Sequence, residues 1–340
     1  MGGKPRIIWV SFAPLEKAAQ GLTSSVASVR YRLTIPACAL DADGFESRVT
    51  YLGAGANRRT LIERFEGADA VVFGKLLAGP ERLEREAEQV FELIAQLRGR
   101  GVAVLADYSD DHFADALRGA VYRALANAVD RVVASTAGLA EVIKQQTTVP
   151  VSVITDPVEG ARAELRVPHA PPYSLLWFGH SVNLDTLQYG LPQLERVAAN
   201  IPYSLTLVTS PGAGAESLPG CRFRAWSTPT LFEELRRCDA VVIPSNLYDP
   251  RKAVKSPKRF TESLWAGRFV LAHALPAYEE LADYGWVGED LGEGLRWYAG
   301  HADEARERVQ RGQSLIAERF APGNIAASWK VVILDAMGKR

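Results

Sequence analysis

The sequence predicts an α/β protein of two domains, each with its own parallel β-sheet. Short runs rich in Val, Ile and Leu alternate with helical patterns along the chain, which is typical of βαβ units. The 340 residues exceed the size at which a single hydrophobic core usually keeps growing. Near mid-chain, Asp156–Pro172 carries four prolines and no sustained period. We therefore expect an N-terminal domain over 1–156, a linker over 157–172 and a C-terminal domain over 173–322.

The strands expected in the first domain are nearly continuous in apolar residues, as strands covered on both faces should be. They are Ile7–Phe12, Ser47–Leu52, Ala70–Phe73, Val102–Asp107, Arg131–Ala134 and Val151–Ile154. The clearest helix between them is Pro80–Arg100, because apolar residues recur there at three- and four-residue spacing.

The same rhythm restarts after the linker. The expected strands are Ser174–Phe178, Ser204–Val208, Cys221–Ala225, Ala240–Pro244 and Phe269–Ala272. Two long helical patterns end the chain, Asp303–Arg319 and Asn324–Met337. Because parallel strands end at one edge of their sheet, we expect ligand sites at these carboxyl edges, facing a cleft between the domains.

The composition excludes several classes of protein. Apolar residues make up 47% and charged residues 23%, which argues against disorder. A net charge of −1 provides no general field for nucleic acid or anionic lipid, so we expect no nucleic-acid partner and at most peripheral membrane contact. Neither a signal peptide nor a membrane span is apparent, and the three cysteines are far apart. We expect free thiols and a cytoplasmic location.

The segment Lys255–Gly267 suggests an anion site. Ser256 followed by Pro257 predicts a helix N-cap and first turn, whose free N–H groups attract anions. Lys255, Lys258 and Arg259 surround this end, where cations are unfavourable unless an anion binds, so we expect them and Ser256 to hold a phosphate. The alternative is a solvated basic turn.

Glu262 lies farther along the same predicted helix. Its carboxylate could accept hydrogen bonds from a ribose, and the alternative is a surface glutamate. Gly179 and His180 follow a predicted strand, so His180 could reach a phosphate there, or could be a structural histidine bonded to backbone. The glycine-rich loop Leu52–Asn57 is more typical of a mobile loop than of a phosphate site.

A carboxylate cluster follows the strand that begins at Val102. Asp110, Asp111 and His112 could bind an acceptor hydroxyl and take its proton. A helix start favoured by aspartates and a metal site are the alternatives. Near the first strand, Arg30 and Arg32 could pair with an acidic acceptor or a phosphate, or could be solvent-facing helix arginines.

Several of these segments resemble family-4-type GT-B glycosyltransferases (glycosyl transferases group 1). Lys255–Gly267, followed by Arg268–Ala272 and Leu275–Leu281, looks like the donor-binding segment of that family. Leu175–His180 looks like its strand-to-glycine turn. The Asp-x-x-Asp-Asp arrangement of Asp107–Asp111 is similar to a subset that builds surface polysaccharides.

The resemblance implies a GT-B architecture of two Rossmann-like domains. It implies transfer of a sugar from a nucleotide-sugar donor to a hydroxyl of a glycan or glycolipid, with retention, no metal and no cofactor, since the nucleotide sugar is a substrate. A terminal helix over about 323–340 would pack back on the first domain. Many members carry a second glutamate where this chain has Val254, which leaves UDP, GDP or CMP donors open.

Other functions of related shape stay as alternatives. A nucleotide-sugar epimerase shares the GT-B fold, and a non-catalytic sugar-binding derivative is compatible with Val254. A nicotinamide dehydrogenase is disfavoured, because no Gly-x-Gly-x-x-Gly follows the first strand.

Overall fold

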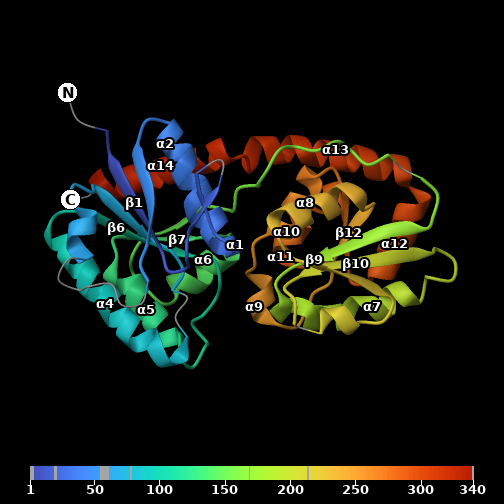
Figure 1. Ribbon diagram of the computed structural model, residues 1–340, viewed down its shortest axis with the longest axis horizontal. Helices are drawn as coiled ribbons and strands as arrows, with labels where there is room; N and C mark the ends of the chain where they lie inside the picture. The colour runs from blue at the N-terminus through green and yellow to red at the C-terminus, as the bar shows by residue number, and fades with distance from the viewer. Residues whose placement is uncertain are drawn as a thin grey trace. The chain divides into compact units, whose positions relative to one another are not determined.

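The computed structural model describes residues 4–18, 21–53, 61–76, 79–167, 169–212 and 214–338. The chain divides into two compact α/β units, which are described separately (Figure 1). Unit 1 comprises Met1–Glu159, Val254–Ser256 and Phe320–Arg340. Unit 2 comprises Gly160–Ala253 and Pro257–Arg319. Unit 1 is therefore assembled from three separate stretches of the sequence.

Unit 1 contains a parallel sheet with the strand order β4-β1-β5-β6-β7-β8 in the described residues. Each of these strands corresponds to one predicted from the sequence. Their bounds are β1 (Arg6–Ser11), β4 (Glu46–Tyr51), β5 (Ala70–Phe73), β6 (Ala103–Tyr108), β7 (Arg131–Ala134) and β8 (Val151–Val153). A short antiparallel hairpin, β2 (Glu16–Ala18) and β3 (Gly21–Thr23), was not predicted.

Both faces of this sheet are covered, which explains why its strands read as continuous apolar runs. In β1, Ile7 and Trp9 point into one hydrophobic cluster, and Ile8 and Val10 into the other. The helices over the two faces are visible in Figure 1. The first face carries α1 (Ala27–Val29), the π-helical turn η1 (Arg30–Thr34), α2 (Ile35–Ala42) and α14 (Pro322–Gly338); the second carries α4 (Pro80–Gly99), α5 (Gly119–Ala128) and α6 (Ala137–Lys144).

The last helix, α14, is part of the core of unit 1. Trp329 is fully buried and its ring meets that of Trp9 edge-on, with the centroids 4.8 Å apart. Ion pairs join Asp335 to Arg131 and Lys330 to Asp43. The apolar stripe of α14 therefore completes one face of the first sheet.

Unit 2 contains a parallel sheet with the strand order β11-β10-β9-β12-β13-β14 in the described residues. Its strands are β9 (Tyr173–Phe178), β10 (Tyr203–Thr209), β11 (Cys221–Ala225), β12 (Ala240–Ile243), β13 (Phe269–His273) and β14 (Trp286–Gly288). Only β14 was missed by the sequence analysis, because three residues are too few to show a strand pattern. The helices are α7 (Leu187–Glu195), α8 (Thr228–Arg237), α9 (Pro250–Ala253), α10 (Lys258–Trp265), α11 (Pro276–Glu279), α12 (Leu291–Gly300) and α13 (Ala302–Arg319), with the 3₁₀ turn η3 at Ser181–Thr186.

The strand order locates a switch point in each sheet. In unit 1 the chain passes from β1 to β4 on one side and then to β5 on the other. In unit 2 it extends from β9 to β10 and β11, and then returns to β12 on the opposite side of β9. Open α/β sheets bind ligands outside the carboxyl ends of their strands at such points. The relevant segments are thus those after β1 and β5, and those after β9 and β12.

The geometry at the end of α10 explains why Gly267 follows Ala266 there. Gly267 has a φ of +73°, a conformation that favours glycine. Its amide donates to the Leu264 carbonyl, and the Arg268 amide donates to the Ser263 carbonyl, which closes the helix. A Cβ at Gly267 would lie 2.2 Å from the carbonyl oxygen of Glu164. Both backbone conformation and space therefore require glycine.

Candidate functional site

The carboxyl edge of the second sheet brings Gly179 and Arg259 together. β9 ends at Phe178, and the Gly179 amide then donates to the Val208 carbonyl at 3.2 Å. A Cβ on Gly179 would be 3.8 Å from Nη1 of Arg259, so this guanidinium lies against the turn. Arg259 is the second residue of α10, which starts near the switch point between β9 and β12.

The guanidinium of Arg259 has an unmet hydrogen-bonding capacity. Its Nη1 is buried and has no hydrogen-bond partner among the described residues. A buried donor without an acceptor is costly, and a cationic one most of all. It also lies at the positive end of a helix, where an anion is favoured. These observations together make the start of α10 a candidate anion site.

His180 turns one ring nitrogen inward and the other outward. Its Nδ1 accepts a hydrogen bond from the Val182 amide at 3.2 Å and thereby caps η3. In neutral imidazole the proton must then reside on Nε2. The backbone-bonded histidine considered from the sequence is thus present, and its exposed ring keeps a donor available on the other side.

Lys258 and Glu262 form an ion pair one turn apart on α10. Nζ of Lys258 is 3.1 Å from Oε1 of Glu262, whose side chain is only 4% exposed. The alternative of a solvated surface glutamate is therefore wrong. The pair places a cation and a carboxylate in the first turns of the helix that carries Arg259.

The predicted N-cap at Ser256 is wrong. The helix begins at Lys258 with Pro257 as its cap residue, and no side chain caps it. The Ser256 hydroxyl donates instead to the carboxylate of Asp156 in unit 1. Its neighbour Lys255 is also in unit 1 and pairs with Asp110. Hydrogen bonds to carboxylates are stronger than those to helix amides, which explains why Lys255 and Ser256 bond to carboxylates of unit 1. Lys258 and Arg259 belong to unit 2, so the predicted basic cluster is divided between the units.

On the carboxyl edge of the first sheet, Asp110 is held between two lysines. Its Oδ2 accepts from Nζ of Lys75 at 2.5 Å, and its Oδ1 accepts from Lys255. Burial alone would raise the pKa of Asp110, but the two ammonium groups lower it to about 2. Asp110 therefore stays ionised through the neutral range and is a weak base.

His112 is a neutral imidazole beside this carboxylate. Burial, and next the charge of Lys75, lower the pKa of His112 to about 4, against the opposing effect of Asp110. Its ring packs on Tyr122 with the centroids 4.6 Å apart. Its Nε2 is buried and has no hydrogen-bond partner within the described residues. The hydrogen-bonding capacity of that nitrogen is therefore unused within the described residues.

Asp111 is engaged in a local turn. Its Oδ1 accepts from the amide of Phe113 at 2.9 Å. The next helix, α5, begins only at Gly119, and the aspartate that receives amides before it is Asp115. Helix capping, one alternative for the carboxylate cluster, is thus not the role of Asp110 or Asp111. The described residues hold no group of three or more His, Cys, Asp or Glu that could bind a metal ion.

Arg30 and Arg32 are buried in η1, so the solvent-facing alternative is wrong. Arg32 is 2% exposed and bonds to Asp107 at 2.6 Å, to Asp156 at 3.1 Å and to the Ile154 carbonyl at 2.6 Å. Arg30 bonds to Glu159 at 3.0 Å and to the Ser24 carbonyl at 2.9 Å. These contacts correct the expectation of a substrate contact, because both guanidinium groups are directed to internal acceptors.

Sequence reasoning missed Lys75 and His273. Lys75 follows Gly74 two residues after β5, beside the switch point of unit 1. Position after a strand was the one signal that could have identified it. His273 is buried at the end of β13; its Nδ1 accepts from the Ser245 amide at 3.0 Å, and its Nε2 lies 2.9 Å from Gln193 Oε1. It holds the start of the loop after β12. Of the glycine-rich loop Leu52–Asn57, residues 54–57 lie outside the described residues.

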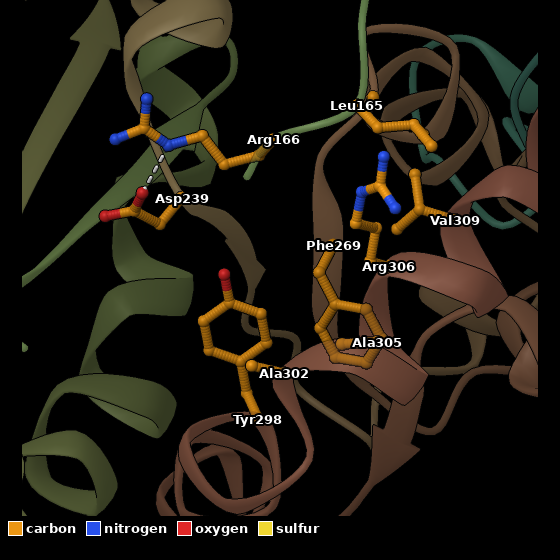
Figure 2. A pocket seen from close by; sticks show the side chains of 10 residues that line it. Leu165, Arg166, Asp239, Phe269, Tyr298, Ala302, Ala305, Arg306 and Val309 are labelled. Atoms are coloured by element: carbon orange, nitrogen blue, oxygen red, sulfur yellow. Dashed lines mark hydrogen bonds and ion pairs between the residues drawn. The ribbon is translucent and has the colours of Figure 1, made fainter. Parts of the chain in front are cut away.

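A hollow in unit 2 lies at the opposite edge of the sheet (Figure 2). Asp239, directly before β12, pairs there with Arg166 at 2.6 Å, with Tyr298 nearby. The same carboxylate accepts from the Ser174 amide at 2.7 Å and contacts His169 at 2.8 Å. These bonds hold the segment after Gly160 to the amino ends of the strands. They serve structure at the edge away from Gly179.

No protein-family model matches the chain, and no curated protein matches it. Solved structures do. An α-glucosyltransferase in complex with UDP and a 13-mer DNA containing a HMU base matches with a TM-score of 0.70 and 9% identity over 98% of this chain and 100% of that one. Anabaena HepE, in complex with UDP and glucose, matches with a TM-score of 0.67 and 11% identity over 97% of this chain and 100% of that one. A glycosyltransferase from Rickettsia africae matches with a TM-score of 0.67 and 9% identity over 99% of this chain and 100% of that one.

These identities are low, so the likeness concerns architecture. All three matches extend over nearly the whole of both chains, and they agree with the two parallel sheets found here. The chain has the GT-B fold, with two Rossmann-like α/β domains.

Proposed function

We propose that this protein is a glycosyltransferase that moves a sugar from a nucleotide-sugar donor to a hydroxyl of a glycan or glycolipid acceptor. The observation that carries the proposal is the buried, unpartnered Nη1 of Arg259 beside the Gly179 turn, at a helix start and a sheet switch point. Structures of the same fold have been solved with UDP or UDP-glucose.

In this proposal the donor binds to unit 2. Arg259, Lys258 and the outward Nε2 of His180 hold the phosphates, and Gly179 keeps the turn open for them. Because charge develops on the departing nucleotide, fixed cations at this edge stabilise the transition state. Glu262, held by Lys258, is placed to accept hydrogen bonds from the ribose. Two cations and a helix terminus supply the positive charge, so we propose that no metal and no cofactor take part.

The acceptor binds to unit 1 in this proposal, near Asp110, Asp111 and His112. His112, with its unpartnered Nε2, donates a hydrogen bond to the acceptor in this proposal. Asp111, of which only Oδ1 is held by the Phe113 amide, takes the proton of the acceptor hydroxyl. Asp110 fixes the charges around His112. Retention of configuration, the family-4 type and a role in surface polysaccharide synthesis are proposed from the resemblance of Lys255–Gly267 and Asp107–Asp111.

In this proposal the nucleotide of the donor sugar is UDP, GDP or CMP. Val254, where many family members have a sugar-contacting glutamate, packs into the core of unit 1. In this proposal a carboxylate that contacts the sugar is either missing or comes from another position. We propose a cytoplasmic enzyme without a nucleic-acid partner and with at most peripheral membrane contact; no helix in the described residues is long and apolar enough to cross a bilayer.

Calorimetry with UDP, GDP and CMP tests the donor site. The substitution Arg259→Gln should weaken binding of the preferred nucleotide by about 1.5–3 kcal/mol, the usual contribution of a hydrogen bond to a charged group. Arg237→Gln is the matched control, because Arg237 lies on α8 and pairs with Glu233 at the surface of the same unit. Equal affinity in wild type and Arg259→Gln contradicts the assignment.

A panel of nucleotide sugars, assayed with and without glycan acceptors, tests the reaction class. Nucleotide release that needs an acceptor supports the transferase. Isomerisation of the sugar without an acceptor identifies an epimerase, and binding without turnover identifies a sugar-binding derivative.

A further inference from the structure

We infer that Lys75, Lys255 and His112 of unit 1 form a receptor for an anionic group, a carboxylate or a phosphate, carried by the acceptor. This inference rests on the proposed function and deepens it. The proposed function requires only a hydroxyl on the acceptor, and the inference adds an anionic group on the same molecule. It makes Lys75 and Lys255 residues that determine specificity.

The first argument is the charge balance around Asp110. Two ammonium groups contact one carboxylate, which leaves an excess of one positive charge. Arg118 pairs with Asp115, so these two add no net charge. Asp111 keeps its negative charge, but its Oδ1 is turned to the amide of Phe113, and among the described residues no ion pair joins it to either lysine. An ammonium group has three N–H donors, and each lysine has one accounted for by Asp110. One lysine would suffice to neutralise Asp110, so the second points to a further anion.

The second argument is that the site is built from anchored parts. The backbone around Lys255 is fixed, since the Val254 carbonyl accepts from Thr136 Oγ1 at 2.8 Å and the Ser256 hydroxyl donates to Asp156. The side chains of Lys75 and Lys255 are 24% and 41% exposed, so both remain accessible to a ligand. Lys75 also follows β5, at the switch point where open sheets receive ligands.

The third argument is the unpartnered nitrogen of His112. Its Nε2 is buried without a hydrogen-bond partner among the described residues, beside the same carboxylate. Buried polar atoms usually have partners, so an isolated one indicates a group that is supplied from outside. A carboxylate or phosphate oxygen accepts an N–H from imidazole and from both ammonium groups.

Binding of small probes tests this inference with the full chain. The probes are methyl glucoside, which is neutral, methyl glucuronide, which carries a carboxylate, and a short alkyl diphosphate. We expect wild type to bind an anionic probe at least about tenfold more tightly than the glucoside, since one charge-assisted hydrogen bond has that effect. Preference for the glucuronide indicates an acidic sugar, and preference for the diphosphate indicates a lipid-linked acceptor.

The variants Lys75→Gln and Lys255→Gln should each remove most of that preference, while affinity for the nucleotide that wild type prefers among UDP, GDP and CMP stays unchanged. Lys144→Gln is the control, because Lys144 lies on α6 and pairs with the exposed Glu141. Circular dichroism verifies folding of each variant. The inference is overturned if wild type shows no preference for either anionic probe over methyl glucoside, whether the probes bind or not. It is also overturned if both variants keep the preference of wild type. A failed donor site would instead appear as absent nucleotide binding with the anion preference intact.

Discussion

At the scale of single residues, the same side-chain types perform opposite tasks according to their surroundings. Arg259 has a buried nitrogen without a partner, whereas Arg32 is saturated by Asp107, Asp156 and a carbonyl. Arg259 was a candidate because of its position near a predicted helix start, and Arg32 because of its position near the first strand. Pattern alone could not separate them, because the acceptors of Arg32 come from strands far away in the sequence.

His169 provides a test of the amino edge of unit 2. Its hydrogen bonds to the Ala170 carbonyl and to Asp239 raise the pKa of His169 above its ordinary value. A folded-state pKa above the unfolded one means that the stabilisation is complete below the unfolded pKa and is lost as pH rises through the folded pKa. We therefore expect His169→Gln to lower the thermal midpoint more at pH 5.5 than at pH 8.5. The first value lies about one unit below the reference pKa of histidine and the second about two units above it. Equal losses at both values would show that the proton is not involved.

At the scale of elements, the long apolar runs were predictable and the short or special ones were not. Every strand of the unit 1 sheet was expected, because burial on both faces leaves a continuous apolar signal. The hairpin β2–β3, the π-helical turn η1 and the strand β14 leave no such signal. In the candidate site, Gly179, His180 and Arg259 follow from strand and helix ends. Lys75 does not, because one lysine after a strand is common on any surface.

Gly267 gives a prediction at this scale. Replacing it with alanine forces a side chain into a positive φ, which costs about 1–2 kcal/mol, and adds the clash with the Glu164 carbonyl. Gly220 is the matched control in the same unit: its φ is +71° and a Cβ there would meet nothing within 4 Å. We expect Gly267→Ala to lower the free energy of unfolding more than Gly220→Ala does, as measured by denaturant titration. The difference between the two variants isolates the clash.

At the scale of the whole molecule, a segment does not always belong to the domain that surrounds it in the sequence. Lys255 and Ser256 show this. They lie between two helices of unit 2, α9 and α10, yet their side chains bond to Asp110 and Asp156 of unit 1. The assignment of Val254–Ser256 to unit 1 depends on partners that are far away in the sequence. No local periodicity of the sequence reveals such partners.

The helix α14 makes the core of unit 1 dependent on the end of the chain. Trp329→Ala should lower the free energy of unfolding of unit 1 by about 3–5 kcal/mol, the usual loss for a buried aromatic residue. Val331→Ala is the control on the same helix, since Val331 is 68% exposed. Hydrogen exchange of amides in β1 and β6 reports unit 1 specifically. Unchanged protection there in Trp329→Ala would contradict the role given to α14.

The division of unit 1 among three stretches has a consequence for the order of biosynthesis. A ribosome makes most of unit 1 first, but Val254–Ser256 follows only after much of unit 2, and Trp329 emerges only after all of unit 2. During translation the first sheet therefore waits with the face under α14 only partly covered, while all of unit 2 up to Arg319 is already synthesised. Unit 1 therefore begins before unit 2 and is completed after it, because the helix that carries Trp329 follows all of unit 2 in the sequence.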